Sequence, residues 1–167
     1  MNKYSLLALG FLFCMAGYAQ TSDTVDSRLI LIGDAGAFRH GKHPVVAAIK
    51  EHFKLDKKTT IVYLGDNVYK AGLPDDAHVD YNTIRAVLDT QVNIAKNTPA
   101  KVYMIPGNHD WENGGRYGFD ALMRQQIYVN QLGDANVSFA PGNGWPGPEP
   151  IKLANNTVLI VFVSQWW

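Results

Sequence analysis

Three short apolar runs constrain this chain more than any other feature, because each is followed at once by glycine and polar side chains. The runs occupy residues 28–32, 59–64 and 100–105, and their content of Ile, Val and Leu predicts three buried strands. Ligands of an open α/β sheet bind outside the carboxyl ends of its strands. We therefore expect the polar side chains that follow the runs to meet at one edge of a sheet. These side chains are Asp34, Asp66, Tyr69, Asn108, His109 and Asp110.

Helical patterns separate the three predicted strands. A proline at the first position and apolar residues at helical spacing predict a helix over 44–55. Asp75 or Asp76 is expected to cap a second helix, and a third is predicted over 119–133. Alternation of strand and helix predicts an α/β fold, with a layered sheet flanked by helices.

The last part of the chain departs from this alternation. Two strands, 151–154 and 157–163, are predicted around a turn, which indicates either a mixed sheet or the start of a second one. The sequence then stops at 164–167, directly after an apolar strand. We expect the domain to be incomplete at the C-terminus and the chain to be part of a longer protein.

Residues 1–19 have the features of a secretory signal peptide, with cleavage expected after Ala19. A membrane anchor is an alternative, although the apolar run is shorter than the roughly 20 residues of a span. Lipidation of Cys14 is another. We expect an exported protein, periplasmic, extracellular or associated with an outer membrane, whose mature segment 20–167 has no membrane span. Residues 20–27 form a polar lead-in, and the mature chain contains no cysteine, so metal ligands must be oxygen or imidazole.

The charge balance bears on partners. The chain carries 15 basic and 15 acidic residues, for a formal net charge of zero with neutral histidines. Nothing here calls for nucleic acid or an anionic membrane surface as a partner. The sequence specifies no oligomeric state.

The polar residues after the strands suit a metal centre. Asp34, Asp66 and Asn108 offer hard oxygen donors, and a carboxylate on the central strand can bridge two ions. Such a pair clamps a phosphoryl oxygen and lowers the pKa of a bound water to give hydroxide. His109 could donate a proton to the leaving-group oxygen, while Asp110 could orient that imidazole or hold the loop. The alternative is that each motif is an ordinary turn without a function. This alternative requires three independent turns, each directly after an apolar strand.

The ordered motifs Gly33-Asp34-Ala35-Gly36, Gly65-Asp66-Asn67-Val68-Tyr69 and Gly107-Asn108-His109-Asp110 resemble the first three motifs of the calcineurin-like metallophosphoesterase superfamily. The resemblance spans roughly residues 28–115, and it implies that 28–167 is the N-terminal portion of such a domain. It implies a layered metallophosphoesterase-type sheet, two metal ions and a small-molecule phosphate ester as the substrate.

Within the superfamily the chain is most similar to the purple acid phosphatase branch. Many relatives carry a histidine ligand where this chain has Gly36, and purple acid phosphatases carry an iron-binding tyrosinate where it has Tyr69. The resemblance implies that Asp34 and Tyr69 bind the first metal. It further implies that Asp66 bridges the two metals, that Asn108 binds the second metal and that His109 assists ester cleavage. The expected metals are Fe(III) with Fe, Zn or Mn(II).

The resemblance also implies histidine ligands beyond the third motif, but His109 is the last of five histidines. We therefore expect the chain alone to be inactive. His40 and His43 are predicted to be loop residues. Two alternatives to a phosphomonoesterase stay open: a Mn- or Zn-dependent phosphodiesterase or nucleotide hydrolase on the same fold, and a truncated, non-catalytic segment of a larger envelope protein.

Overall fold

The computed structural model describes residues 25–37, 43–132 and 135–166. The predicted signal peptide, His40 and most of the polar lead-in lie outside these residues. Four parallel strands form the main sheet in sequential order, which confirms the predicted α/β class. The strands are β1 (Arg28–Ile32), β2 (Thr59–Tyr63), β3 (Lys101–Met104) and β4 (Val137–Phe139).

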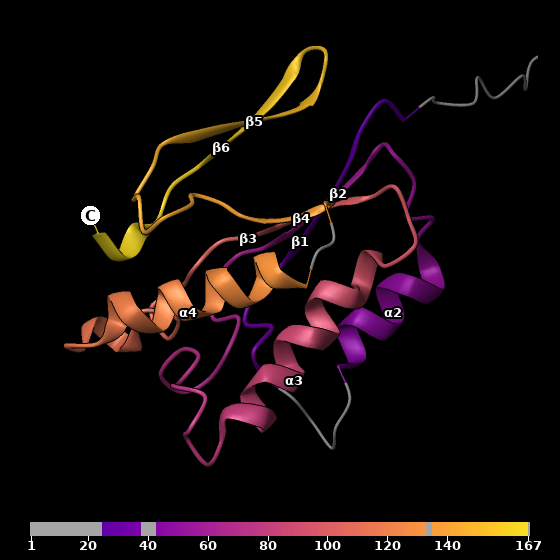
Figure 1. Ribbon diagram of the computed structural model, residues 1–167. Helices are drawn as coiled ribbons and strands as arrows, with labels where there is room; N and C mark the ends of the chain where they lie inside the picture. The colour runs from indigo at the N-terminus through magenta and orange to yellow at the C-terminus, as the bar shows by residue number, and fades with distance from the viewer. Residues whose placement is uncertain (1–24, 38–42, 133–134, 167) are drawn as a thin grey trace, which may run out of the picture.

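Three helices connect the strands and lie together on one face of the sheet (Figure 1). They are α2 (Pro44–His52), α3 (Tyr81–Val92) and α4 (Gly118–Gln131), with short 3₁₀ turns η1 (Asn93–Ala95), η2 (Glu112–Gly114) and η3 (Ser164–Trp166). Because the strand order is sequential and parallel crossovers share one hand, successive helices fall on the same side. Within the described part of the chain, none of the helices is long and apolar enough to cross a membrane.

Strand register brings the ends of the first three strands level. Ile32 pairs with Tyr63, and Tyr63 pairs with Met104. The chain leaves all three strands on the same edge, where Leu64 N–H donates to the Ile32 carbonyl at 2.8 Å and Ile105 N–H to the Tyr63 carbonyl at 2.9 Å. The loops that carry the predicted site residues therefore start side by side.

The core lies between the sheet and the helices. All five residues of β2 are buried, as expected for a central strand covered on both faces. Helix α2 contributes Val46 and Ile49, and α3 contributes Val87, Leu88 and Val92. Burial of this apolar surface stabilises the packing of the helices against the sheet.

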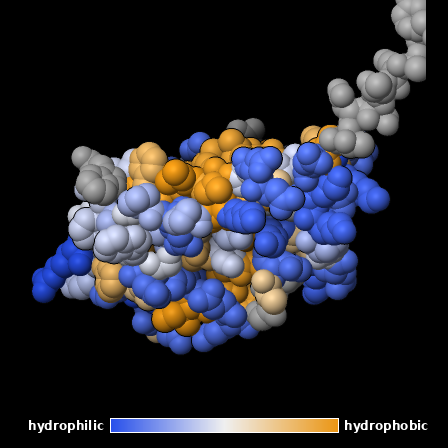
Figure 2. Space-filling model, turned by 90° about the horizontal axis from the view of Figure 1, so that it is seen from above, coloured by the Kyte–Doolittle hydropathy of each residue, from blue (hydrophilic) through white to orange (hydrophobic). Residues whose placement is uncertain are grey.

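A β-hairpin covers the opposite face (Figure 1). Its strands, β5 (Glu149–Ala154) and β6 (Thr157–Val161), form a separate antiparallel sheet, so the second-sheet alternative is the right one. Ile151 and Val161 of the hairpin are buried, and they pack against Tyr103 of β3 and Ile105, the residue that follows β3. Figure 2 shows apolar side chains reaching the surface when the molecule is seen from above. Strand β6 and the residue that follows it expose Val158, Ile160 and Phe162 to solvent.

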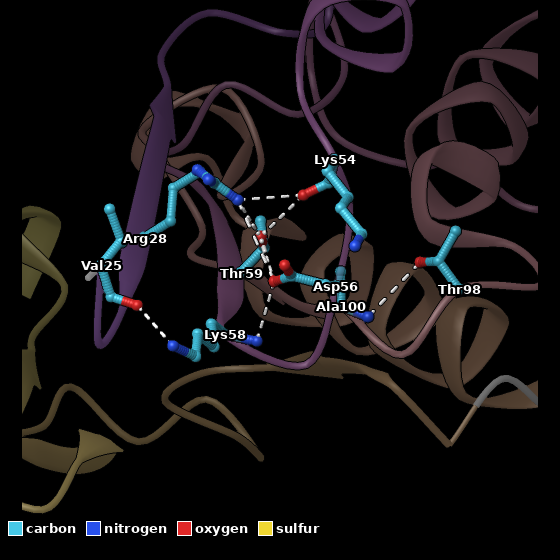
Figure 3. A network of polar contacts seen from close by, with 8 residues as sticks. All are labelled: Val25, Arg28, Lys54, Asp56, Lys58, Thr59, Thr98 and Ala100. Atoms are coloured by element: carbon cyan, nitrogen blue, oxygen red, sulfur yellow. Dashed lines mark hydrogen bonds and ion pairs between the residues drawn. The ribbon is translucent and has the colours of Figure 1, made fainter. Parts of the chain in front are cut away.

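A polar network ties the amino ends of β1 and β2 together (Figure 3). Nη1 of Arg28 donates to the Lys54 carbonyl at 3.0 Å and to Oγ1 of Thr59 at 2.9 Å. Asp56 lies 4.0 Å from the same guanidinium nitrogen and accepts from Lys58 N–H at 3.0 Å. This network fixes the edge of the sheet opposite the candidate site.

Several predicted boundaries need correction. Helix α2 ends at His52 rather than near 55, and α3 starts at Tyr81 without a side-chain cap. Asp75 instead accepts from Ala77 N–H at 3.0 Å and holds a turn ahead of the helix. Strand β4 was not predicted, because three residues are too few to show a period.

Candidate metal centre

Two of the predicted ligands leave their strands through an unusual backbone conformation. Asp34 has φ of 53° and Asp66 has φ of 52°, the left-handed region that few non-glycine residues adopt. Strained backbone of this kind costs of order 1–3 kcal/mol per residue and concentrates at functional sites. The same unusual turn therefore presents a carboxylate after β1 and again after β2.

Tyr69 joins the two carboxylates. Its phenol oxygen lies 2.8 Å from Oδ1 of Asp34 and 3.2 Å from Oδ2 of Asp66. Partial burial raises the pKa of the Tyr69 phenol well above its usual range, and the two carboxylates raise it further. Without a cation the phenol thus keeps its proton, and its O–H donates a hydrogen bond to the carboxylate oxygens.

Gly36 makes room for the Tyr69 ring. Its N–H donates to the Asp66 carbonyl at 2.7 Å. A Cβ at this position would lie 2.7 Å from that carbonyl oxygen and 2.9 Å from Cδ2 of Tyr69. A histidine at position 36 would collide with this backbone and ring, so this arrangement accommodates the tyrosine and excludes the histidine.

The loop after β3 approaches the loop after β2 very closely. A Cβ on Gly107 would lie 2.3 Å from Oδ1 of Asp66, so only glycine fits there. Asn108 follows, and its Nδ2 donates to Oδ1 of Asn113 at 2.8 Å, which leaves the amide oxygen for a cation. Asp34, Asp66 and Asn108 line one cavity of about 440 Å³.

His109 stands beside the same residues. Its backbone N–H donates to Oδ1 of Asp66 at 3.3 Å, and its ring meets the Tyr69 ring edge-on at a centroid distance of 4.6 Å. Nδ1 lies 2.7 Å from the Lys70 carbonyl. Since a carbonyl can only accept, Nδ1 carries the proton of this bond, and Nε2 is the nitrogen left for a substrate.

Asp110 performs the second of its two predicted roles. Its carboxylate is fully buried and accepts several N–H groups, so it holds the loop rather than the His109 imidazole, which the Lys70 carbonyl orients. The donors are the backbone N–H groups of Gly107, Asn67 and Val68 and the side-chain amide of Gln125. Burial raises the pKa of Asp110 to about 6, although these donors act to lower it.

Several residues that shape the site were not predicted from the sequence. His43 was expected in a loop but is buried, and its Nδ1 accepts from Val46 N–H at 3.3 Å as the N-cap of α2. Gln91, buried on α3, bonds to two of the loops. Trp111, directly after the third motif, was expected at an apolar rim of the substrate site, but it is buried in the core.

The donor set fits a cation at the first position. The Tyr69 phenol oxygen lies within 3.2 Å of a carboxylate oxygen of Asp34 and of one of Asp66, and these are hard oxygen ligands. Asn108 and the shared Asp66 are the donors at hand for a second ion. Among the described residues, no group of three or more His, Cys, Asp or Glu side chains could hold a metal ion. The donors gathered here include a tyrosine and an asparagine, Tyr69 and Asn108, which are not residues of those four types.

A parallel sheet whose carboxyl-edge loops carry these oxygen donors fits the fold of a metal-dependent phosphoesterase. The chain belongs to the calcineurin-like phosphoesterase family, whose family model matches residues 21–161. Membership implies hydrolase activity on phosphoesters, in a family that generally uses two metal ions. Comparisons with curated proteins and with solved structures returned no match.

Proposed function

We propose that this protein is an exported phosphomonoesterase with a binuclear centre of the purple acid phosphatase type, containing Fe(III) and a divalent Fe, Zn or Mn ion. The observation that carries the proposal is the contact of the Tyr69 phenol oxygen with both Asp34 and Asp66. A phenol is a poor ligand for most divalent ions until it loses its proton. A trivalent, hard cation beside two carboxylates is the partner best able to displace that proton.

In this proposal some of the site residues bind the metal ions and another acts on the leaving group. Asp34, Tyr69 and Asp66 would hold the first ion, and Asp66 with Asn108 the second. When bound, the ions supply positive charge for the phosphoryl oxygens and an activated water. When the His109 ring carries a proton on both nitrogens, Nε2 could donate a hydrogen bond or that proton to the leaving oxygen, while the Nδ1–H bond to the Lys70 carbonyl fixes the ring.

Monoester preference is tested by comparing two substrates. Protein isolated from its own cells is loaded with iron, its metal content is measured, and its hydrolysis of an aryl phosphate monoester is compared with that of a bis-aryl phosphodiester. The proposal expects bound iron and faster turnover of the monoester than of the diester. Faster turnover of the diester, with Mn or Zn as the activating ion, would favour the phosphodiesterase alternative instead.

A further inference from the structure

Gln91 is a polar side chain in an apolar place. It lies on the inner face of α3 between Leu88 and Val92 and is completely inaccessible to solvent. An amide buried in this way destabilises a protein unless it is hydrogen bonded. Its Nε2 donates to the Ala35 carbonyl at 3.1 Å and to the Asn67 carbonyl at 2.6 Å. One side-chain amide therefore connects two different loops.

The two accepting carbonyls belong to the residues that directly follow the paired carboxylates. Ala35 comes after Asp34, and Asn67 comes after Asp66. Each bond thus acts one residue away from a left-handed backbone turn that is unfavourable by itself. A donor that bridges these carbonyls holds both turns at one separation.

The position of Gln91 is itself fixed from the sheet. The hydroxyl of Tyr63, at the end of β2, donates to the Gln91 backbone carbonyl at 3.1 Å, and both residues are wholly buried. Tyr63 precedes the loop of Asp66 on the same strand. The end of α3 is therefore tied to the strand whose loop the Gln91 amide also binds.

A second helix supports one side of this arrangement. Nε2 of His43, the N-cap of α2, lies 2.7 Å from the Ala35 carbonyl. Because Nδ1 of the ring accepts from Val46 N–H, the neutral imidazole carries its proton on Nε2 and donates it to that carbonyl. The Asp34 loop is thus held from α2 and α3, and of these two helix side chains Gln91 also binds the Asp66 loop.

We propose that Gln91 is a positioning residue that sets the separation of the Asp34 and Asp66 carboxylates for the metal pair. This inference rests on the proposed function, since it assumes that the two carboxylates share ions. The Oε1 atom of Gln91 is buried without a hydrogen-bond partner in the described structure. An unsatisfied buried acceptor costs stability, so the amide is better explained by what its nitrogen holds than by packing.

The test compares Gln91→Met with Gln126→Met. Methionine keeps the volume and removes both donors. Gln126 is also a buried glutamine, but on α4, and its amide is paired with Asn143 at 3.0 Å and 2.7 Å, in a different loop. Both variants lose side-chain hydrogen bonds, so both are expected to unfold more easily. Co²⁺ binding is followed by visible absorption, and thermal unfolding is followed on the same samples.

We expect Gln91→Met to bind Co²⁺ about 10–100-fold more weakly with a changed absorption envelope, as loss of a partner behind a ligand usually does. Gln126→Met should bind Co²⁺ like the unmodified chain. Gln91→Asn, whose shorter amide cannot span both carbonyls, should resemble Gln91→Met and gives the answer if the methionine variant does not fold.

Equal Co²⁺ affinity and spectrum in Gln91→Met and the unmodified chain would overturn the inference and leave the metal centre standing. Loss of the fold in both Gln91 variants would also overturn it, because Gln91 would then serve the fold alone. Failure of the unmodified chain to bind Co²⁺ would overturn the proposed metal centre, and this inference with it.

Discussion

The phenol oxygen of Tyr69 lies 2.8 Å from Oδ1 of Asp34, although 35 residues separate the two in the chain. The contact links the loop after β1 to the loop after β2 across their shared edge of the sheet. Gly36 permits it, because any side chain at position 36 would meet the Tyr69 ring. The close approach of Gly36 therefore leaves room for the Tyr69 ring and none for a side chain at position 36.

Tyr69→Phe should abolish the violet tyrosinate-to-iron absorption of the iron-loaded protein. The phenylalanine ring fits the same space but offers no oxygen to the ion. Tyr117→Phe is the matched control, because Tyr117 is exposed. Absorption spectra at equal iron content make the comparison, and a violet band that survives in Tyr69→Phe would remove Tyr69 from the ligands.

Gly36→Ala should destabilise the protein by roughly 1–3 kcal/mol, the usual effect of overpacking a filled region. The added Cβ would lie 2.7 Å from the Asp66 carbonyl oxygen and 2.9 Å from Cα of Val68. Gly33→Ala is the control, since a Cβ at position 33 would meet nothing within 4 Å. Denaturant unfolding of both variants measures the difference, and equal stabilities would contradict the close approach.

Asp110 should make the stability of the metal-free protein depend on pH. Burial raises its pKa from 3.8 to about 6, so the folded state binds this proton more tightly than the unfolded state does. The protonated Asp110 carboxyl therefore contributes to the free energy of unfolding in full below pH about 4. This contribution, about 3 kcal/mol in all, is lost as the pH rises through 6.

Asp110→Asn isolates this effect, because asparagine does not titrate. With chelator present, the stability of the unmodified chain relative to Asp110→Asn should fall between pH 4 and pH 7. If that difference grows with pH instead, the N–H donors around Asp110 outweigh its burial, and the carboxyl is ionised with a low pKa.

Export can be checked on the N-terminus of the mature protein. Cleavage after Ala19 leaves Gln20 as the first residue, which mass spectrometry of the protein from an exporting cell should show. A lipid-modified Cys14 at the N-terminus would establish the lipoprotein alternative. An unprocessed Met1 on a membrane-bound product would favour the anchor.

The first three strands of the sheet, and the edge at which their following loops meet, were predictable from the sequence. Buried parallel strands give continuous apolar runs, and such runs end where the chain reaches the edge. The paired ends of Ile32, Tyr63 and Met104 confirm that reasoning. The sequence could not show the left-handed turns at Asp34 and Asp66, because their conformation depends on contacts between the loops.

The supporting residues were harder to predict for a similar reason. From the sequence, Asp110 could equally have faced the His109 ring or its own loop. The packing of α4 determines which of the two it faces, because it places the Gln125 amide beside the Asp110 carboxylate. Gln91 did leave a signal. It falls at helical spacing from the apolar residues Val87 and Leu88, and a glutamine on such an apolar face is out of place unless it binds something.

The most direct measurement of the central claim is anomalous diffraction from crystals of the protein grown with Zn²⁺. The account predicts a zinc peak among the side chains of Asp34, Asp66 and Asn108, about 2.0–2.2 Å from the carboxylate oxygens that bind the ion. Zinc bound elsewhere in the chain, with none at these three residues, would contradict it.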